Sequence, residues 1–308
     1  MRQLAILGAS SQIAKDLILA SRDDVQLLLY VRDVLATQGW LEKNDLGGAC
    51  SVFDYSQYGI APHEAVINFV GVGDPQRAAE MGSSIFGVTS KFDQLAMSGL
   101  ISNPDRRYIF LSSGAAYGSA FPEPVDAETP SRIDINSLPP QEFYAVAKLH
   151  AEAQHRANPD LAIVDVRVFN YFSRTQDLSA RFLITDVVRS IRDGSTLSTS
   201  SDFMVRDFLN PVDFRLLVNA ILDSPPSNDV VDCFTLGAVE KSVLLDHMRE
   251  RFGLRYEVNS DAVTVNATGK KPHYYSLNRR AEQYGYRPTM NSMEGISIET
   301  AAILAAAG

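Results

Sequence analysis

The sequence predicts an α/β fold, in which a doubly wound parallel sheet is joined to a smaller C-terminal α/β domain. Over the first two-thirds of the 308 residues, short runs of Val, Ile, Leu, Phe and Tyr alternate with longer amphipathic segments. Several short runs are apolar on both faces, which is typical of strands buried between two layers of helices. Regular alternation of strands and helices indicates right-handed crossovers and hence a parallel sheet.

The elements follow in order along the chain. Strands are expected at Leu4–Leu7, Gln26–Val31, Ser51–Phe53, Ala65–Val70, Arg107–Leu111 and Ala162–Val168, and helices at Ser11–Ser21, Pro75–Gly99 and Pro140–Ala157. The region 118–140 is rich in Pro, Asp, Glu and Ser and is expected to be a long loop. Loops of that length are uncommon unless they are functional.

Composition excludes several classes of function. The formal net charge of -9 argues against binding to nucleic acid or to an anionic membrane surface, because both need a basic face. Cys50 and Cys233 are too far apart for a zinc motif or a disulfide framework, and the spacing of the histidines predicts no metal site. No apolar run is long enough for a signal sequence or a membrane span. We therefore expect a cytoplasmic protein.

The N-terminal strand leads through a tight turn into a helix. Gly8 permits the turn, and Ser10, Ser11, Gln12 and Ile13 open the helix. Free N–H groups and the positive end of the helix dipole suit a pyrophosphate at this position. Small residues replace the later glycines of the usual fingerprint. The alternative is an ordinary β–α turn with a serine cap.

Charged residues at two strand ends bear on the choice of dinucleotide. Arg32 and then Asp33 follow the second strand. An acidic residue there binds the adenosine ribose, whereas an arginine accommodates a 2′-phosphate. Arg32 comes first, which favours NADP, with NAD as the alternative. Asp54 ends the third strand and is placed to accept from the adenine amino group or to cap a turn.

A hydroxyl-bearing strand end and a later helix form the candidate catalytic group. Tyr144 and Lys148 are four residues apart, so they share a helix face. The ammonium is expected to lower the pKa of the phenol and make it a usable acid or base. Ser113 ends a buried strand, where ligands bind in parallel sheets, and is expected to hold the substrate oxygen. Ser112 is its rival for that role.

Several motifs together resemble those of the extended short-chain dehydrogenase/reductases, the NAD-dependent epimerase/dehydratase family that acts on nucleotide-activated sugars. The similar segments are Ser113–Gly118, Tyr144–Lys148, Arg167–Phe172, Arg206–Asp213, Phe234–Gly237 and Asn278–Pro288. The resemblance implies a Rossmann sheet with Ser113, Tyr144 and Lys148 as catalytic residues. It also implies that Asn170 and Arg206 contact the substrate near its diphosphate. A salt bridge to Asp207 or Asp202 is the alternative for Arg206.

The resemblance also implies a domain division and a partner. Residues 1–169, with about 207–238 returning to them, are expected to bind the dinucleotide, and 170–206 and 239–308 the substrate. The helices at 75–99 and 140–157 are expected to pair with a second copy in a homodimer, although core packing would give the same pattern. Gly114 and Ala115 stand where the family's dehydratases carry Asp and Glu, which argues against water elimination.

The sequence thus predicts an NADP(H)-dependent reduction, or the reverse oxidation, at a keto or hydroxyl carbon of a nucleotide-activated sugar. A 4-epimerase with tightly held NAD would use the same residues. A redox sensor that binds NADP without turnover is the third alternative, and the retention of Ser113, Tyr144 and Lys148 argues against it.

Overall fold

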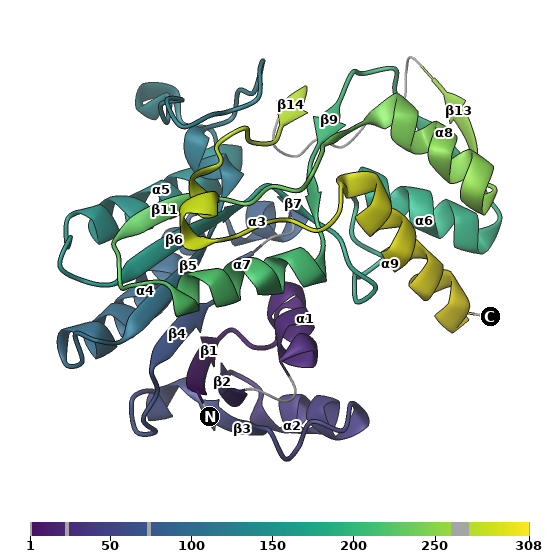
Figure 1. The fold of residues 1–308 in the computed structure, drawn as a ribbon. Helices are drawn as coiled ribbons and strands as arrows, with labels where there is room; N and C mark the ends of the chain where they lie inside the picture. The colour runs from purple at the N-terminus through teal and green to yellow at the C-terminus, as the bar shows by residue number, and fades with distance from the viewer. Residues whose placement is uncertain (1, 22–24, 73–74, 260–270, 308) are drawn as a thin grey trace.

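The computed structural model describes residues 2–21, 25–72, 75–259 and 271–307. Its centre is a seven-stranded sheet in the order β11-β6-β5-β4-β1-β2-β3, in which all neighbouring strands are parallel (Figure 1). The strands are β1 (Arg2–Leu7), β2 (Val25–Val31), β3 (Cys50–Asp54), β4 (Ala65–Asn68), β5 (Arg107–Ser113), β6 (Ile163–Val168) and β11 (Asp229–Asp232). The strand order reverses between β1 and β4, so the predicted doubly wound sheet is confirmed.

Helices cover both faces of the sheet. Along β1, Leu4 and Ile6 pack into one core, and Ala5 and Leu7 into the core on the opposite face. The first core lies under α1 (Gln12–Ala20), α2 (Val34–Lys43) and α7 (Pro211–Asp223), and the second under α4 (Ser84–Ile101) and α5 (Phe143–Arg156). Burial on both faces is the reason that the strand sequences are almost continuously apolar.

The single helix expected over 75–99 is wrong, because the chain forms α3 (Pro75–Met81) and then α4. Gly82, between them, has φ +52°, a left-handed conformation that ends a helix and that glycine adopts without steric cost. The Ser84 hydroxyl donates to the Met81 carbonyl at 2.6 Å and closes the turn.

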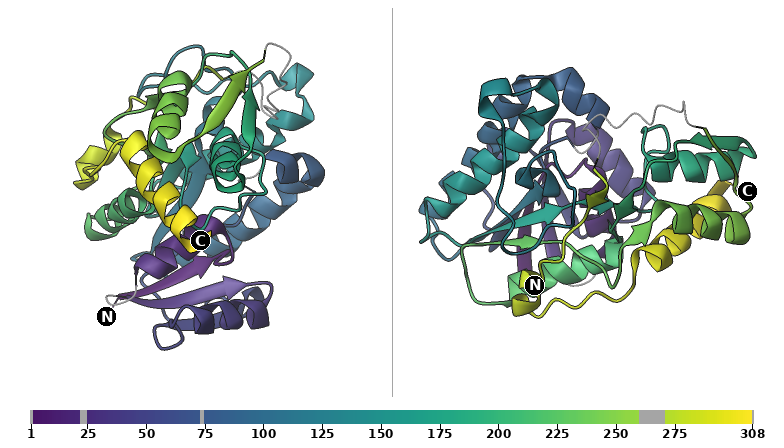
Figure 2. Two further views of the ribbon diagram at one scale, coloured as in Figure 1. Left: turned by 90° about the vertical axis from the view of Figure 1, so that its right-hand side faces the viewer. Right: turned by 90° about the horizontal axis from the view of Figure 1, so that it is seen from above.

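The C-terminal part forms three small sheets and a second core. The sheets are β7 (Asn170–Tyr171) with β10 (Phe208–Leu209), β12 (Val239–Glu240) with β9 (Val205–Arg206) and β14 (His273–Tyr274), and β13 (Arg255–Val258) with β8 (Thr196–Thr199). Val187, Val188, Leu244 and Met248 are central to the core, which lies among α6 (Leu183–Asp193), α8 (Lys241–Phe252) and α9 (Ser292–Ala307). Figures 1 and 2 show these helices gathered to one side of the large sheet, with the C-terminus among them. Of the helices that the structure describes, none is long and apolar enough to cross a membrane.

Candidate active site

The turn between β1 and α1 brings the backbone close to the end of β4. Gly8 has φ +78°, and a Cβ there would lie 2.9 Å from the Val70 nitrogen. Only glycine fits this position without a shift of the backbone. Ser11 caps α1, its hydroxyl accepting from the Ala14 N–H at 3.4 Å. The turn therefore presents an open helix N-terminus at the carboxyl edge of the sheet, as a pyrophosphate site requires.

Gln12, at the first position of α1, reaches the segment after β7. Its amide nitrogen donates to the Ser173 hydroxyl at 3.0 Å and to the Gln176 side-chain oxygen at 2.9 Å. One helix turn later, Asp16 accepts from Tyr171 and Thr175. β7 and the segment after it are thereby tied to the start of α1. Ser10 and Ile13 stand at the same turn.

The acidic residues expected at the adenosine end cap short helices. Asp33 caps α2 by accepting from the Ala36 N–H at 2.9 Å. Asp54 caps the turn after β3 by accepting from the Ser56 N–H at 2.9 Å, which is the capping alternative left open for it. Arg32 is exposed at the end of β2.

Ser113 and Tyr144 come together at the carboxyl end of β5. Ser113 is buried, and the half-buried side chain of Tyr144 at the start of α5 lies beside its hydroxyl. Burial raises the pKa of Tyr144 well above its usual range, although the bond from Ser113 opposes the rise. The expected lowering of this pKa is therefore wrong for the ligand-free chain, in which the phenol is neutral.

Lys148 lies one helical turn beyond Tyr144, on the same face. Its Nζ is 5.8 Å from the Tyr144 ring centroid and 4.3 Å from that of Phe110, and it donates to the Leu111 carbonyl at 2.6 Å. Burial lowers the pKa of Lys148 to about 8, although three carboxylates near it oppose the shift. Because the ammonium bonds to β5 rather than to the phenol, it does not offset the burial of Tyr144.

Behind Lys148 lies a buried charged cluster. His155 Nδ1 is 2.6 Å from Asp165 Oδ1, and its Nε2 is 2.8 Å from Asp93 Oδ1. Burial opposes a charge on the imidazole, but the hydrogen bonds with Asp165 and Asp93 outweigh it and raise the pKa of His155 to about 9. Tyr108 also donates to Asp93, at 2.9 Å. The cluster joins α4, α5, β5 and β6 in the interior next to Lys148.

Ser112 points away from this centre. Its hydroxyl donates to Glu152 at 2.5 Å, and Glu152 also accepts from Arg167. Ser112 is therefore part of a buried hydrogen-bond network on the far side of β5, whereas Ser113 lies beside Tyr144.

The Asn170 side chain is bonded to backbone. Its amide donates to the carbonyls of Asp207 at 3.2 Å and Tyr274 at 3.1 Å.

Arg206 and Lys271 form a pair of cations beside the paired strands β9 and β14. Arg206 donates to the carbonyls of Val205 and Lys271. Burial lowers the pKa of Arg206 to about 10, and burial together with Arg206 lowers that of Lys271 to about 8. Within the residues that the structure describes, no carboxylate forms an ion pair with either. Two crowded cations without a bound carboxylate suit an anionic ligand such as a diphosphate.

Sequence reasoning missed two residues of this site, Lys271 and Tyr274. The Tyr274 hydroxyl lies 3.4 Å from Ser113 Oγ. The two-residue strand β14 carries Tyr274 to this position by pairing with β9, in register with Arg206. Neither a motif nor a period in the sequence marks so short a strand, so no local signal could have found it.

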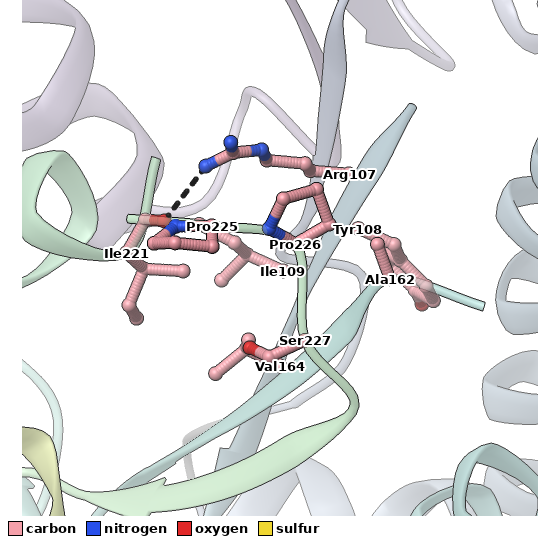
Figure 3. Close-up of a pocket in the computed structure, with 9 residues that line it drawn as sticks. All are labelled: Arg107, Tyr108, Ile109, Ala162, Val164, Ile221, Pro225, Pro226 and Ser227. Carbon is pink, nitrogen blue, oxygen red and sulfur yellow. Dashed lines mark hydrogen bonds between the residues drawn. The ribbon is translucent and has the colours of Figure 1, made fainter. Parts of the chain in front are cut away.

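Two cavities of the described structure lie away from these residues. One of about 10 Å³, near the space of a single water, is lined by the start of β5, the start of β6 and the segment before β11 (Figure 3). Arg107 there donates to the Ile221 carbonyl at 3.1 Å. That is the amino edge of the strands, opposite the edge that carries Ser113. The second lies against α8 and the start of α9.

Comparisons with known proteins show one matching family and several solved structures with a similar fold. The model of the NAD dependent epimerase/dehydratase family matches residues 52–237. No curated protein sequence matches the chain. Among solved structures, UDP-N-acetylglucosamine 4-epimerase from Methanobrevibacter ruminantium, in complex with UDP-N-acetylmuramic acid, is similar with a TM-score of 0.82 at 14% identity, covering 99% of both chains. UDP-glucose 4-epimerase from Thermotoga maritima is similar with a TM-score of 0.79 at 14% sequence identity, and the match covers 99% of this chain and 100% of that one. MoeE5 in complex with UDP-glucose and NAD is similar with a TM-score of 0.78 at 17% identity, and the match covers 100% of both chains.

Proposed function

Because the chain belongs to the NAD dependent epimerase/dehydratase family, we propose that it transfers hydride between a nicotinamide dinucleotide and a nucleotide-activated sugar. The observation that carries the proposal is the meeting of Ser113, Tyr144 and Lys148 at the carboxyl end of β5, beside the β1–α1 turn. A neutral phenol, a hydroxyl and a buried ammonium at one edge of a parallel sheet are what proton-coupled carbonyl reduction requires.

The residues present fit a dinucleotide. Gly8 allows close approach of a pyrophosphate to the backbone, and the N-terminus of α1 offers N–H donors. Lys148 Nζ lies beside Gly71 at the end of β4, 3.4 Å from where a Cβ on that glycine would stand, so it is within reach of a ribose at the sheet edge. The bound dinucleotide would supply or accept the hydride.

The roles of the side chains follow from their positions. Tyr144 donates a proton to the sugar oxygen during reduction and accepts it during oxidation. Ser113 donates a hydrogen bond to the same oxygen and holds it in line. Lys148, whose ammonium bonds to the Leu111 carbonyl in the ligand-free chain, binds the nicotinamide ribose. Arg206 and Lys271 bind the substrate diphosphate, the role proposed for Arg206 from its motif.

The domain division predicted from the sequence assigns the dinucleotide and the nucleotide sugar to different parts of the chain. In our proposal, residues 1–169 with about 207–238 hold the dinucleotide, and 170–206 with 239–308 hold the nucleotide sugar. The two parts face each other where Tyr144 and Tyr274 both approach Ser113. Asn170, whose amide bonds to backbone on the substrate side, would then position the substrate segment more than it contacts the substrate.

We propose NADP as the preferred dinucleotide, with NAD as the alternative. The exposed Arg32 at the end of β2 supports NADP, and one oxygen of the neighbouring Asp33 is engaged in capping α2. NAD, in turn, is bound in the MoeE5 complex. To test the choice, both dinucleotides are titrated against wild type, Arg32→Ala and, as a control, the exposed Arg192→Ala on α6. NADP should bind more weakly to Arg32→Ala than to the wild type, and Arg192→Ala should bind it as the wild type does. Equal wild-type affinities that Arg32→Ala leaves unchanged would exclude the role of Arg32.

The direction of the chemistry separates the two leading functions. A reductase exchanges NADP and consumes NADPH in step with the sugar. A 4-epimerase, which the similarity to the Methanobrevibacter and Thermotoga enzymes favours, holds NAD tightly and shows no net change in it. The dinucleotide is extracted from purified protein and identified, and UDP-glucose is then supplied while dinucleotide absorbance and sugar products are followed. A bound dinucleotide with no turnover of any nucleotide sugar would instead support the redox sensor.

Assembly and location are further proposals. The helices α4 and α5 pack against each other on one face of the sheet, and a second copy would add its own pair to form a four-helix homodimer interface. Sedimentation equilibrium would give the mass of the assembly in solution.

The separate free thiols of Cys50 and Cys233 are typical of a reducing compartment, which supports a cytoplasmic location.

A further inference from the structure

Tyr274 reaches the reaction centre from the substrate side. Its hydroxyl lies 3.4 Å from Ser113 Oγ, which also accepts from the Ala115 N–H at 3.2 Å. Ser113 is therefore flanked by two phenols, Tyr144 from α5 and Tyr274 from β14. These come from opposite sides of the proposed domain division.

The Tyr274 ring is held firmly in this position. Phe121 meets it edge-to-face with ring centroids 4.8 Å apart, and the centroid of Phe169 is at 5.2 Å. Its backbone carbonyl accepts from the Asn170 amide, and β14 is paired with β9. A hydroxyl fixed by this many contacts is pre-positioned for a ligand, because little side-chain freedom remains to be lost on binding.

Two cations lie against the same ring. Lys271 Nζ is 4.6 Å from the Tyr274 ring centroid, and the Arg206 guanidinium carbon is 5.8 Å from it. The ring thus stands between the catalytic hydroxyls and the proposed diphosphate site. A ligand that joins a diphosphate to an oxygen-rich ring has to pass along this side chain to bring one of its oxygens to Ser113.

Hydrogen-bond capacity indicates what Tyr274 does when such a ligand arrives. A serine hydroxyl has one donor and two acceptor positions. Ser113 Oγ accepts from the Ala115 N–H at 3.2 Å, the Tyr274 hydroxyl is 3.4 Å away, and Tyr144 lies beside it on the other side. A sugar oxygen that enters between Ser113 and Tyr144 takes the remaining position on Ser113, and the Tyr274 hydroxyl, at a long 3.4 Å from Ser113 Oγ, keeps capacity to bond a second oxygen.

We propose that Tyr274 is a substrate-contacting residue, whose hydroxyl binds the sugar oxygen adjacent to the one held by Ser113 and Tyr144. This deepens the proposed function, on which it rests, and it requires a substrate with oxygens on adjacent sugar carbons. A purely structural Tyr274 would need only its ring, because Phe would keep the contacts to Phe121 and Phe169.

The test removes only that hydroxyl. Binding of UDP-glucose and of UDP is measured by calorimetry with wild type, Tyr274→Phe and the control Tyr275→Phe. Tyr275 is the next residue, and successive side chains of an extended segment point to opposite sides. Loss of one hydrogen bond should weaken UDP-glucose binding to Tyr274→Phe roughly two- to tenfold. UDP binding should not change in either variant, and Tyr275→Phe should bind both ligands as wild type does.

Two results would overturn the proposal while leaving the proposed function intact. If Tyr274→Phe binds UDP-glucose as tightly as wild type or more tightly, the hydroxyl only fills the empty site. If it loses UDP and UDP-glucose equally, Tyr274 supports the Arg206 strand and does not contact the sugar. Wild-type protein that binds neither ligand would contradict a UDP-sugar substrate, and this inference with it.

Discussion

Affinity for the dinucleotide should fall as the pH rises from 7 to 9, because Lys148 loses its charge in that interval. Burial lowers the pKa of Lys148 to about 8 in the ligand-free chain, against the pull of nearby carboxylates. An amine is charged below its pKa and neutral above it. About nine-tenths of the molecules therefore carry the ammonium at pH 7, and about one-tenth at pH 9.

The magnitude follows from this loss of charge. If the ribose hydroxyls bind the ammonium form, the complex keeps its proton and the free protein must take one up to bind. The Kd should then rise about tenfold between pH 7 and 9, which corresponds to ~1.4 kcal/mol. Calorimetric titration of NADP or NAD at several pH values measures the change directly.

Lys148→Arg is the matched control, because a guanidinium stays charged throughout this range. Its affinity for the dinucleotide should be almost independent of pH, even if it is weaker overall. A wild-type Kd that is constant from pH 7 to 9 would refute the reasoning. An equal rise in Lys148→Arg would assign the effect to another group.

Two further predictions concern charged groups outside the catalytic trio. Arg206→Gln should raise the Kd for UDP roughly tenfold to a hundredfold and leave dinucleotide affinity unchanged, since charge-assisted hydrogen bonds contribute about 1.5–3 kcal/mol; an unchanged Kd for UDP would make Arg206 structural. His155, with its pKa raised from 6.5 to about 9 by Asp165 and Asp93 against the cost of burial, contributes stability that is complete below pH 6.5 and lost as the pH rises through 9. His155→Gln should therefore lower the free energy of unfolding by about 3–5 kcal/mol at pH 6, and by clearly less at pH 9.5, in denaturant titrations; an equal loss at both would argue against a charged imidazole.

The local parts of the site could be predicted from the sequence. Gly8 and Ser11 mark a β–α turn within a few residues, and Tyr144 and Lys148 share a face simply by helical spacing. Strands that are buried on both faces can also be predicted from their almost continuously apolar composition. These features depend on neighbouring residues, so a single sequence contains them in full.

The remaining features depend on distant contacts. Tyr274 and Lys271 enter the site only because β14 pairs with β9, some 70 residues away in the chain, and a two-residue strand has no period to detect. The raised pKa of Tyr144 could not be predicted from the sequence either, because it depends on burial and because Lys148 Nζ bonds to the Leu111 carbonyl instead of the phenol. Gly82 could be read as a helix residue or a break, and its φ decided between them.

The central claim is that Tyr144 transfers the proton to or from the sugar oxygen, and Tyr144→Phe tests it most directly. The substitution keeps the ring and Lys148 but removes the hydroxyl. The measurement is kcat for the nucleotide sugar that the wild type converts, together with the Kd of the dinucleotide. The account predicts that kcat falls by about 10²–10⁴ while the Kd stays nearly unchanged. Turnover of Tyr144→Phe at the wild-type rate would contradict it.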